Sequence, residues 1–292
     1  MVAEPTRRLR AAVLGTGKIG LDLAERIGKS GVLECALVVG RDRSSRGLRE
    51  AAAMGLATAA DGIDSLARSG EHFDVVFDAS HAAAHTAHQV QLAATGAVLV
   101  DLTPSGAGTR VVPSVNGTRA LPSRHFNLIS CGGQTAIPVL HALAQVCGPT
   151  YMEVVATAAT ASTGRGTRLN IDEYISTTQV AVQELACQAP VKALLNLTPA
   201  DPAPPFRVAV AALAPTAETD AVQAAVHAAA ERVRDYAPGY AVTSCTVTGQ
   251  RIDVALEVTA RSGHIPWYAG NLDIINAAAV HMAEQHAAAL TR

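Results

Sequence analysis

The sequence predicts an α/β protein in two parts, a doubly wound parallel sheet followed by an α+β domain. Its 292 residues exceed one ordinary domain and suit two domains of roughly 100–200 residues each. Before Pro149, short apolar runs alternate with helical segments at the spacing of βαβ units, which favours a parallel sheet covered on both faces. After Pro149, strands and helices no longer alternate regularly, as is typical of an α+β domain.

The elements follow from apolar runs and from helical periodicity. In the first part we expect strands at residues 9–14, 33–39, 73–78, 97–102 and 127–130. We expect one helix that follows the first strand and ends near residue 29, and further helices that span residues 46–54, 82–94 and 135–146. In the second part we expect strands at 151–160, 208–213, 242–247 and 252–258, and helices at 172–187, 219–236 and 271–290. We place the first domain at residues 1–130 and the second at 131–270, with a closing helix at 271–292 that packs back on the first.

Composition excludes several classes of protein. Hydrophobic residues make up 49% and charged residues 16%, which excludes a disordered chain. The net charge of −2 offers no field to attract nucleic acid or an anionic membrane. The five cysteines are odd in number and lack a CxxC pair, so we expect neither a disulfide framework nor a thiolate metal site. Without a signal-peptide core or an apolar run of about 20 residues, a cytoplasmic protein is expected.

A glycine pattern after the first strand predicts a dinucleotide site. Gly15 permits a tight turn, Gly17 lets the backbone approach a pyrophosphate, and Gly20 lets the next helix pack on its strand. The helix N-terminus then offers free N–H groups to the phosphates. The candidate residues of this loop are Gly15, Thr16, Gly17, Lys18, Ile19 and Gly20.

Residues after the second strand bear on the choice of cofactor. Asp42 stands where an acidic residue binds the ribose 2′-hydroxyl of NAD. Its neighbours Arg41 and Arg43 could instead hold the 2′-phosphate of NADP, or form a solvated basic loop. We favour NAD and leave NADP open.

Ser130-Cys131-Gly132-Gly133-Gln134 is the candidate catalytic turn. A cysteine at a helix N-terminus has its thiolate stabilised by the helix dipole, which lowers the pKa of the thiol. Gly132 and Gly133 leave backbone N–H groups available as oxyanion donors. The turn could equally hold a buried structural cysteine. Beside a nucleotide site, however, a thiolate could add to an aldehyde, pass hydride to a nicotinamide and retain the acyl group as a thioester.

Three further features have both a functional and a structural interpretation. His81, His85 and His88 share a helix face and could bind a metal, but an Ala-rich helix surface is the better interpretation, so no metal site is predicted. His264 is a candidate general base. Asn271 could orient a carboxamide or cap the closing helix.

Six sequence blocks carry a resemblance to a known family. They are GTGKIG at Gly15, FDASHAAAH at Phe77, DLTP at Asp101, CGGQ at Cys131, GRGTRLNIDEY at Gly164 and YAGNLDI at Tyr268. In this order, over nearly the whole chain, they resemble the acylating acetaldehyde dehydrogenases, which convert acetaldehyde and CoA to acetyl-CoA in complex with a 4-hydroxy-2-oxovalerate aldolase.

The resemblance implies a fold, a site and partners. It implies a Rossmann-like domain and a catalytic α+β dimerisation domain, with Cys131 as the thioester nucleophile and Gln134 in its turn. It implies CoA as co-substrate, an aldolase partner and a homodimer. Beyond the glycine loop, the cofactor contacts that it implies are Ser162, Thr163, Gly164, Arg165, Gly166, Thr167, Arg168, Leu169, Asn170 and Asn271.

The chain departs from the family pattern at three places. Val208 follows Arg207 where the family carries an aspartate thought to assist proton transfer. The chain is shorter near residues 246–253, and Trp267 replaces a smaller residue, so we expect an altered pocket wall. One alternative is therefore an enzyme that reduces a bulkier, even aromatic, acyl-CoA to its aldehyde. Another is a weakly active nucleotide-binding subunit that stabilises an aldolase, and a phosphate-dependent semialdehyde dehydrogenase ranks lower.

Overall fold

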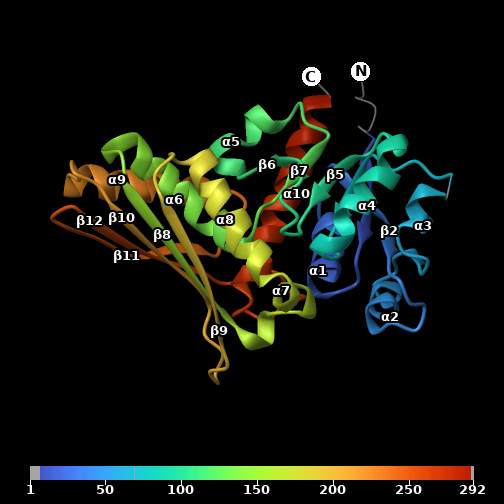
Figure 1. Cartoon of the computed structure of the whole chain (residues 1–292). Coiled ribbons are helices and arrows are strands. Elements are labelled where there is room, and N and C mark those ends of the chain that lie inside the picture. The colour runs from blue at the N-terminus through green and yellow to red at the C-terminus, as the bar shows by residue number, and fades with distance from the viewer. Residues whose placement is uncertain (1–6, 69, 291–292) are drawn as a thin grey trace, which may run out of the picture.

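The chain forms two β-sheets that lie side by side, with the last helix between them. A computed structural model describes residues 7–68 and 70–290. The first sheet has seven strands in the order β3-β2-β1-β4-β5-β7-β6, and the second has five in the order β11-β12-β10-β8-β9. Figure 1 shows the first sheet on the right, the second on the left and helix α10 (Gly270–Leu290) between them.

The first sheet is parallel throughout, as predicted. Its strands are β1 (Leu9–Leu14), β2 (Leu33–Val39), β3 (Thr58–Ala59), β4 (Val75–Asp78), β5 (Val98–Asp101), β6 (Thr109–Arg110) and β7 (His125–Asn127). The connecting helices are α1 (Lys18–Gly28), α2 (Arg46–Ala53), α3 (Asp64–Ala67), α4 (Ala82–Leu92) with the 3₁₀ turn η1 (Ala93–Thr95), and α5 (Pro113–Ala120). The strand order reverses between β1 and β4, which opens a crevice at the carboxyl ends of these strands, where open α/β sheets bind ligands.

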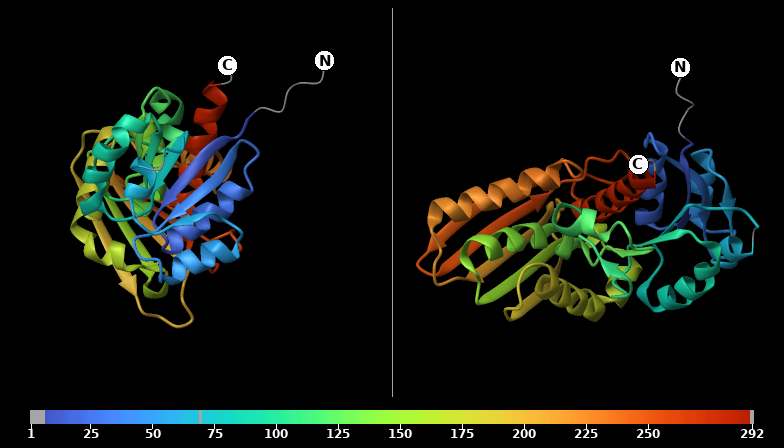
Figure 2. Two further views of the ribbon diagram at one scale, coloured as in Figure 1. Left: turned by 90° about the vertical axis from the view of Figure 1, so that its right-hand side faces the viewer. Right: turned by 90° about the horizontal axis from the view of Figure 1, so that it is seen from above.

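The second sheet is mixed and is covered on one face. Its strands are β8 (Tyr151–Ala159), β9 (Val191–Thr198), β10 (Phe206–Leu213), β11 (Tyr240–Thr248) and β12 (Arg251–Val258), and only the pairing of β8 with β9 is parallel. Helices α6 (Cys131–Cys147), α8 (Ile171–Leu185) and α9 (Thr219–Arg234) pack on one face (Figure 2). Side chains of β10 alternate accordingly: Val208 is buried and Arg207 is exposed on the other face.

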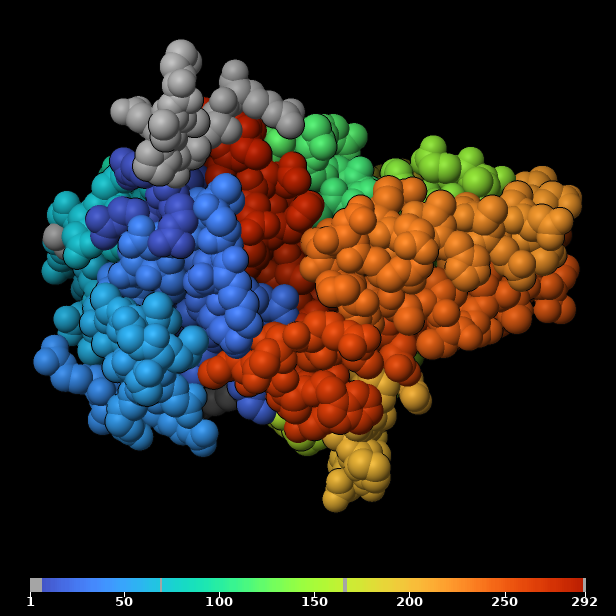
Figure 3. Space-filling model, turned by 180° about the vertical axis from the view of Figure 1, so that it is seen from behind, coloured from blue at the N-terminus to red at the C-terminus, as the bar shows by residue number. Residues whose placement is uncertain are grey.

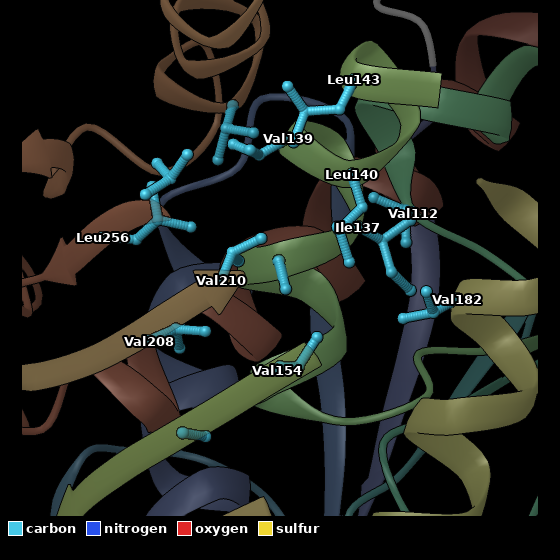
Figure 4. Packing of buried hydrophobic residues seen from close by; sticks show 14 of the residues in the cluster. Val112, Ile137, Val139, Leu140, Leu143, Val154, Val182, Val208, Val210 and Leu256 are labelled. Atoms are coloured by element: carbon cyan, nitrogen blue, oxygen red, sulfur yellow. The ribbon is translucent and has the colours of Figure 1, made fainter. Parts of the chain in front are cut away.

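The core of this second part lies between the sheet and α6. Val208 and Val210 of β10 and Leu256 of β12 are within 1% of full burial and belong to one cluster with Ile137 and Leu140 of α6 (Figure 4). Each such side chain stabilises the fold by about 1.5–3 kcal/mol relative to the exposed state. The packing therefore fixes helix α6, and with it the turn that precedes it.

Helix α10 is fastened to α1 by a buried polar network. The guanidinium of Arg26 contacts Asp22 Oδ2 at 2.7 Å and Asp273 Oδ1 at 2.5 Å. Asn276 Nδ2 donates to Asp22 Oδ2 at 2.7 Å. Figure 3 shows the molecule from behind: helix α10, in red, lies between the blue N-terminal part and the orange segment that includes α9. These contacts hold α10 against α1.

The structure differs from the sequence expectations mainly at element ends. Helix α6 begins at Cys131 rather than near residue 135, because the Ser130 side chain accepts a hydrogen bond from Gly133 N and starts the helix one turn earlier. Strands β3, β6 and β9 and helices α3 and α5 were not expected at all. Across residues 7–68 and 70–290, no helix has the length and apolarity needed to span a membrane.

Candidate active site

A cavity of about 970 Å³ lies at the crevice between the two parts of the chain. The glycine loop after β1 and the turn after β4 form one wall, while Cys131 and the segment before α8 form another. Residues predicted from the sequence supply much of the lining: Gly15, Thr16, Gly17, Lys18, Ile19, Arg41, Cys131, Ser162, Gly164, Thr167, Asn170 and Asn271. A crevice of this size at the switch point of a parallel sheet suits an extended nucleotide.

The glycine loop has the shape expected of a phosphate site. Gly15 has a φ of +121°, and a Cβ there would lie 2.6 Å from the carbonyl oxygen of Ala79, so only glycine fits. At Gly17, in contrast, a Cβ would meet nothing within 4 Å, because this residue faces open space at the start of α1. The N-terminus of α1 is thus open to an anion in the cavity.

Lys18 connects this loop to the other wall of the cavity. Its Nζ donates to the carbonyl oxygen of Ala161 at 2.6 Å, in the 3₁₀ turn η2 (Thr160–Ser162). The following helix α7 (Arg165–Leu169) leads to Asn170 and then into α8. The Ser162–Asn170 segment therefore lies opposite the glycine loop.

Cys131 is the first residue of α6 and lines the cavity. The chain reaches it through Ile129, whose φ of +65° is an unusual conformation for a β-branched residue. Such strain persists only where the surrounding structure imposes it, and it clusters at functional sites. Here it turns the chain from β7 into α6 and brings Cys131 to the crevice.

The polar contacts of the turn differ from the prediction. The N–H of Gly132 donates to Tyr174 Oη at 2.9 Å, and that of Gly133 donates to Ser130 Oγ at 2.9 Å, so neither is free as an oxyanion donor. The prediction of a lowered thiol pKa is also wrong for the ligand-free chain: burial raises the pKa of Cys131 to about 11, against the lowering effect of its hydrogen bond with Tyr174. Removal of water from the thiol thus outweighs the hydrogen bonds that would stabilise the thiolate.

Asn271 provides the test of fit for a nicotinamide. Its side chain is 5% exposed and lines the cavity, and its Oδ1 has no hydrogen-bond partner among the residues that the structure describes. A buried carbonyl oxygen left unpaired costs about 1–3 kcal/mol, which an amide donor of a ligand would recover. The carboxamide of a nicotinamide carries such a donor, so the residues present fit a nicotinamide cofactor.

The acidic residue expected to select NAD lies elsewhere. Asp42 is exposed, and its Oδ1 accepts from Ser44 N at 2.8 Å and from Ser44 Oγ at 2.7 Å. These hydrogen bonds lower the pKa of its carboxyl group. Arg41 lines the cavity and Asp42 does not, so the reason for preferring NAD over NADP is not supported by the geometry.

Other predicted residues also lie away from the cavity. Gln134 is fully buried and donates to the carbonyl oxygens of Val111 and Leu128. Its side chain therefore stabilises the interior and does not face a substrate. His264 is exposed on the loop after β12, where neighbouring Ser262 contacts Glu25. Trp267 is 55% exposed and forms no part of the described cavity wall. The described cavity lining likewise excludes Gly20, Thr163, Arg168 and Leu169, and the side chains of Arg165 and Gly166 fall outside the described ones.

The histidines of α4 form a buried network, which corrects the prediction of a helix surface. His85 is fully buried, with Nδ1 2.8 Å from Asp78 Oδ2 and Nε2 2.9 Å from His125 Nε2. Asp101 Oδ2 lies 3.3 Å from His85 Nε2 and accepts from Ser105 and Asn127. These groups therefore form one connected set of polar contacts behind the cavity wall.

The network reaches the cavity through His88. Its Nδ1 lies 2.8 Å from Asp78 Oδ2, and His88 lines the cavity together with His81. Burial raises the pKa of Asp101 to about 6 and lowers that of His125 to about 4. The network thus fixes the ends of β4 and β5 behind the cavity wall.

Sequence reasoning gave no role to several cavity residues. Tyr174 falls in one of the six blocks, one turn into a helix, but no pattern indicated that its hydroxyl would reach Cys131. Residues after β4 and β5 could have been found from the rule that ligands meet the carboxyl ends of parallel strands. They are Ser80, Leu102, Thr103 and Pro104.

The fold and the site together define a class of protein: a dehydrogenase-like protein with a crevice suited to a nucleotide and a cysteine on the wall of that crevice. The family model described as prokaryotic acetaldehyde dehydrogenase, dimerisation, matches residues 131–266. A protein named acetaldehyde dehydrogenase from Streptomyces griseus subsp. griseus is 50% identical over 277 residues, which cover 95% of this chain and 90% of that protein. One of the same name from Brevibacillus brevis is 39% identical over 284 residues, 96% of each chain.

These matches show the family: the chain belongs to the acetaldehyde dehydrogenases. A solved structure of aspartate semialdehyde dehydrogenase II from Vibrio cholerae, complexed with ASA, superposes with a TM-score of 0.66 over 95% of this chain and 98% of that one. Its sequence identity is 14%, so it supports the fold alone. The predictions of family and fold class are confirmed.

Proposed function

We propose that the chain is an NAD(P)-dependent, CoA-acylating aldehyde dehydrogenase that works through a thioester on Cys131. One observation carries the proposal: Cys131 and the glycine loop from Gly15 to Ile19 line the same cavity. Membership of the acetaldehyde dehydrogenases supports the substrate class, a short aldehyde and its acyl-CoA.

The proposed cofactor site follows the cavity wall. The α1 N-terminus and the N–H groups of Thr16, Gly17 and Lys18 would hold the pyrophosphate. Asn271 Oδ1 would accept from the nicotinamide carboxamide. We keep NAD as the proposed cofactor and expect NADP to be accepted too, because Arg41 lines the cavity while Asp42 does not.

Cys131 would carry the acyl group. The electron pair of its thiolate forms a bond to the aldehyde carbon, and the carbonyl π pair moves to oxygen, which gives the alkoxide of a hemithioacetal. A nicotinamide bound in the cavity would supply the hydride acceptor for that carbon, and the hydride donor in the reverse direction. Re-formation of the carbonyl leaves a thioester on Cys131, which the CoA thiolate attacks so that Cys131 departs as a thiolate. Val208 is buried and has no proton to exchange, so we assign no proton transfer to that position.

We propose the same division of labour as the sequence suggested. Residues 1–130 would bind the nucleotide, residues 131–270 would carry catalysis and dimerisation, and residues 271–292 would close on the first part. The description of the matching family model as a dimerisation domain supports a homodimer. The face of the second sheet that α6, α8 and α9 leave open offers a surface for it. An aldolase partner remains part of the proposal through the family resemblance.

Steady-state turnover tests the proposal. The protein is incubated with acetaldehyde, CoA and NAD or NADP, and then with NADH or NADPH and a series of acyl-CoAs from acetyl to benzoyl. We expect reduced cofactor and acyl-CoA in the first assay, with activity abolished in a Cys131→Ala variant. Activity confined to bulky or aromatic thioesters would instead identify the reductive enzyme. No turnover in either direction, with cofactor still bound, would contradict the enzyme assignment and favour a binding subunit.

A further inference from the structure

The hydroxyl of Tyr174 lies against the sulfur of Cys131. Tyr174 is the fourth residue of α8 and is 5% exposed. Its Oη lies 3.6 Å from Cys131 Sγ and 2.9 Å from the backbone nitrogen of Gly132. The approach is close enough that a Cβ on Gly132 would lie 2.2 Å from this oxygen. Helix α8 thus delivers a phenol to the N-terminal turn of α6.

The N–H of Gly132 can only donate, so Tyr174 Oη accepts from it. With the neutral thiol, the contact between Tyr174 Oη and Cys131 Sγ can have either group as the donor. A Cys131 thiolate can only accept, so in that state Tyr174 is the donor. Burial raises the pKa of Tyr174 well above 10, so the phenol stays protonated. Tyr174 is consequently placed as a hydrogen-bond donor and is unsuited to act as a base.

The surroundings of Cys131 give this donor particular weight. Val208, where the family resemblance implied a carboxylate, is 1% exposed and pairs across the sheet with Ala156. Ala156 belongs to the same apolar cluster as Tyr174, and its Cβ approaches Gly132. Among the described side chains, the hydrogen bond to Cys131 Sγ comes from Tyr174. Burial disfavours a charge on this sulfur, and the backbone N–H groups of Gly132 and Cys131 also lower the pKa of the thiol, so Tyr174 adds a side-chain donor to these two.

We propose that Tyr174 is a catalytic residue that stabilises the Cys131 thiolate by donating its hydroxyl hydrogen to Sγ. The inference rests on the proposed function and names a group for its first step. In that step the S–H bond breaks, the electron pair stays on sulfur and the proton passes to water in the cavity. Tyr174 neither gains nor loses a proton. The N–H of Gly132 orients the hydroxyl, which explains why the position takes glycine.

The test is the rate of alkylation of Cys131 by iodoacetamide in the cofactor-free enzyme, followed from pH 7 to pH 10 by mass spectrometry of the peptide that contains Cys131. Tyr174→Phe removes only the hydroxyl. Loss of a charge-assisted hydrogen bond raises the pKa of the Cys131 thiol by about one unit or more, which lowers the fraction of thiolate. Part of the resulting loss in rate is offset because a more basic thiolate is more nucleophilic. We therefore expect alkylation roughly three- to tenfold slower at every pH in this range.

A matched control is available in strand β11, which also contacts α6. Tyr240 is 1% exposed, and its hydroxyl donates to the carbonyl oxygen of Thr135 in α6 at 2.9 Å. Tyr240→Phe therefore also removes a buried hydroxyl from the packing of α6, and we expect its alkylation curve to coincide with that of the unmodified protein. A Tyr174→Phe curve that coincides as well would overturn the proposal.

A second measurement covers failure of the Tyr174→Phe variant to fold, judged by circular dichroism. Site-specific 3-fluorotyrosine at position 174 makes the hydroxyl a stronger donor, and we expect faster alkylation below pH 9. An unchanged rate would refute the proposal. Alkylation requires no substrate, so these results stand even if the protein turns over neither aldehyde nor acyl-CoA. Conversely, the unmodified protein could turn over its substrates while Cys131 is alkylated at the same rate in the Tyr174→Phe variant and in the unmodified protein. That result would support the proposed function and contradict the proposed role of Tyr174.

Discussion

Gly20 faces the carbonyl oxygen of Gly15 so closely that a Cβ on Gly20 would lie 1.9 Å from it. Gly17, between them in sequence, has no neighbour within 4 Å of the corresponding position. Gly20 and Gly17 therefore have different roles. Gly20 permits α1 to pack against its own entry turn, and Gly17 leaves room for a ligand at the N-terminus of α1.

This difference predicts opposite phenotypes for two alanine substitutions. Gly17→Ala should leave the free energy of unfolding within about 0.5 kcal/mol of the unmodified value but weaken cofactor binding at least about tenfold, since the methyl group occupies ligand space. Gly20→Ala should lower the stability by about 1–3 kcal/mol, because backbone must move. Urea denaturation and calorimetric titration with NAD and NADP measure both effects. A Gly17→Ala variant with unchanged affinity would argue against a nucleotide at this loop.

The buried network between α1 and α10 predicts a large stability effect. Arg26→Leu leaves Asp22 and Asp273, both fully buried, without their cation. Removal of one partner from a buried ion pair costs about 3–5 kcal/mol. Arg251→Leu is the control, because its pair with Asp253 is solvent-exposed and such pairs contribute about 0–1 kcal/mol. Equal losses for the two variants in urea denaturation would show that the network does not fasten the closing helix.

His125 predicts a pH dependence of stability. Its pKa is about 4 in the folded chain, since burial and the neighbouring His85 disfavour its charge, against about 6.5 when unfolded. The unfolded chain thus binds the extra proton between these values, and stability is lost as the pH falls from 6.5 towards 4. His125→Asn removes this loss.

We therefore expect the stability of His125→Asn, relative to the unmodified protein, to improve by about 1–2 kcal/mol between pH 7.5 and pH 5. The comparison of the two proteins at each pH cancels the opposite contribution of Asp101, whose raised pKa of about 6 favours the folded state as the pH falls. A stability difference that stays constant with pH would contradict the buried, neutral state of His125.

The sequence was most informative where one local pattern determines one structure. The glycine loop and the apolar strands before Pro149 predicted the parallel sheet, because glycine spacing and strand burial are local properties. Strand β9 was missed: its Lys192, Asn196 and Thr198 interrupt the apolar pattern, and it lies at the edge of the sheet.

The candidate site was predicted only in part because its contacts cross the chain. Cys131 was identified from its own turn, but the pKa of its thiol depends on burial and on the hydrogen bond from Tyr174, which is 43 residues away in the sequence. His85 was assigned to a surface because alanine-rich helices are compatible with either environment. Its burial results from Asp78 and His125, which the sequence does not place beside it.

The central claim is that Cys131 bonds covalently to the acyl group, and mass spectrometry of the acid-quenched protein tests it most directly. After incubation with acetyl-CoA or benzoyl-CoA and no reduced cofactor, the peptide containing Cys131 should gain the mass of the acyl group and lose it on treatment with hydroxylamine. A protein that turns over these thioesters while Cys131 stays unmodified, or that keeps its activity as Cys131→Ala, would contradict the account.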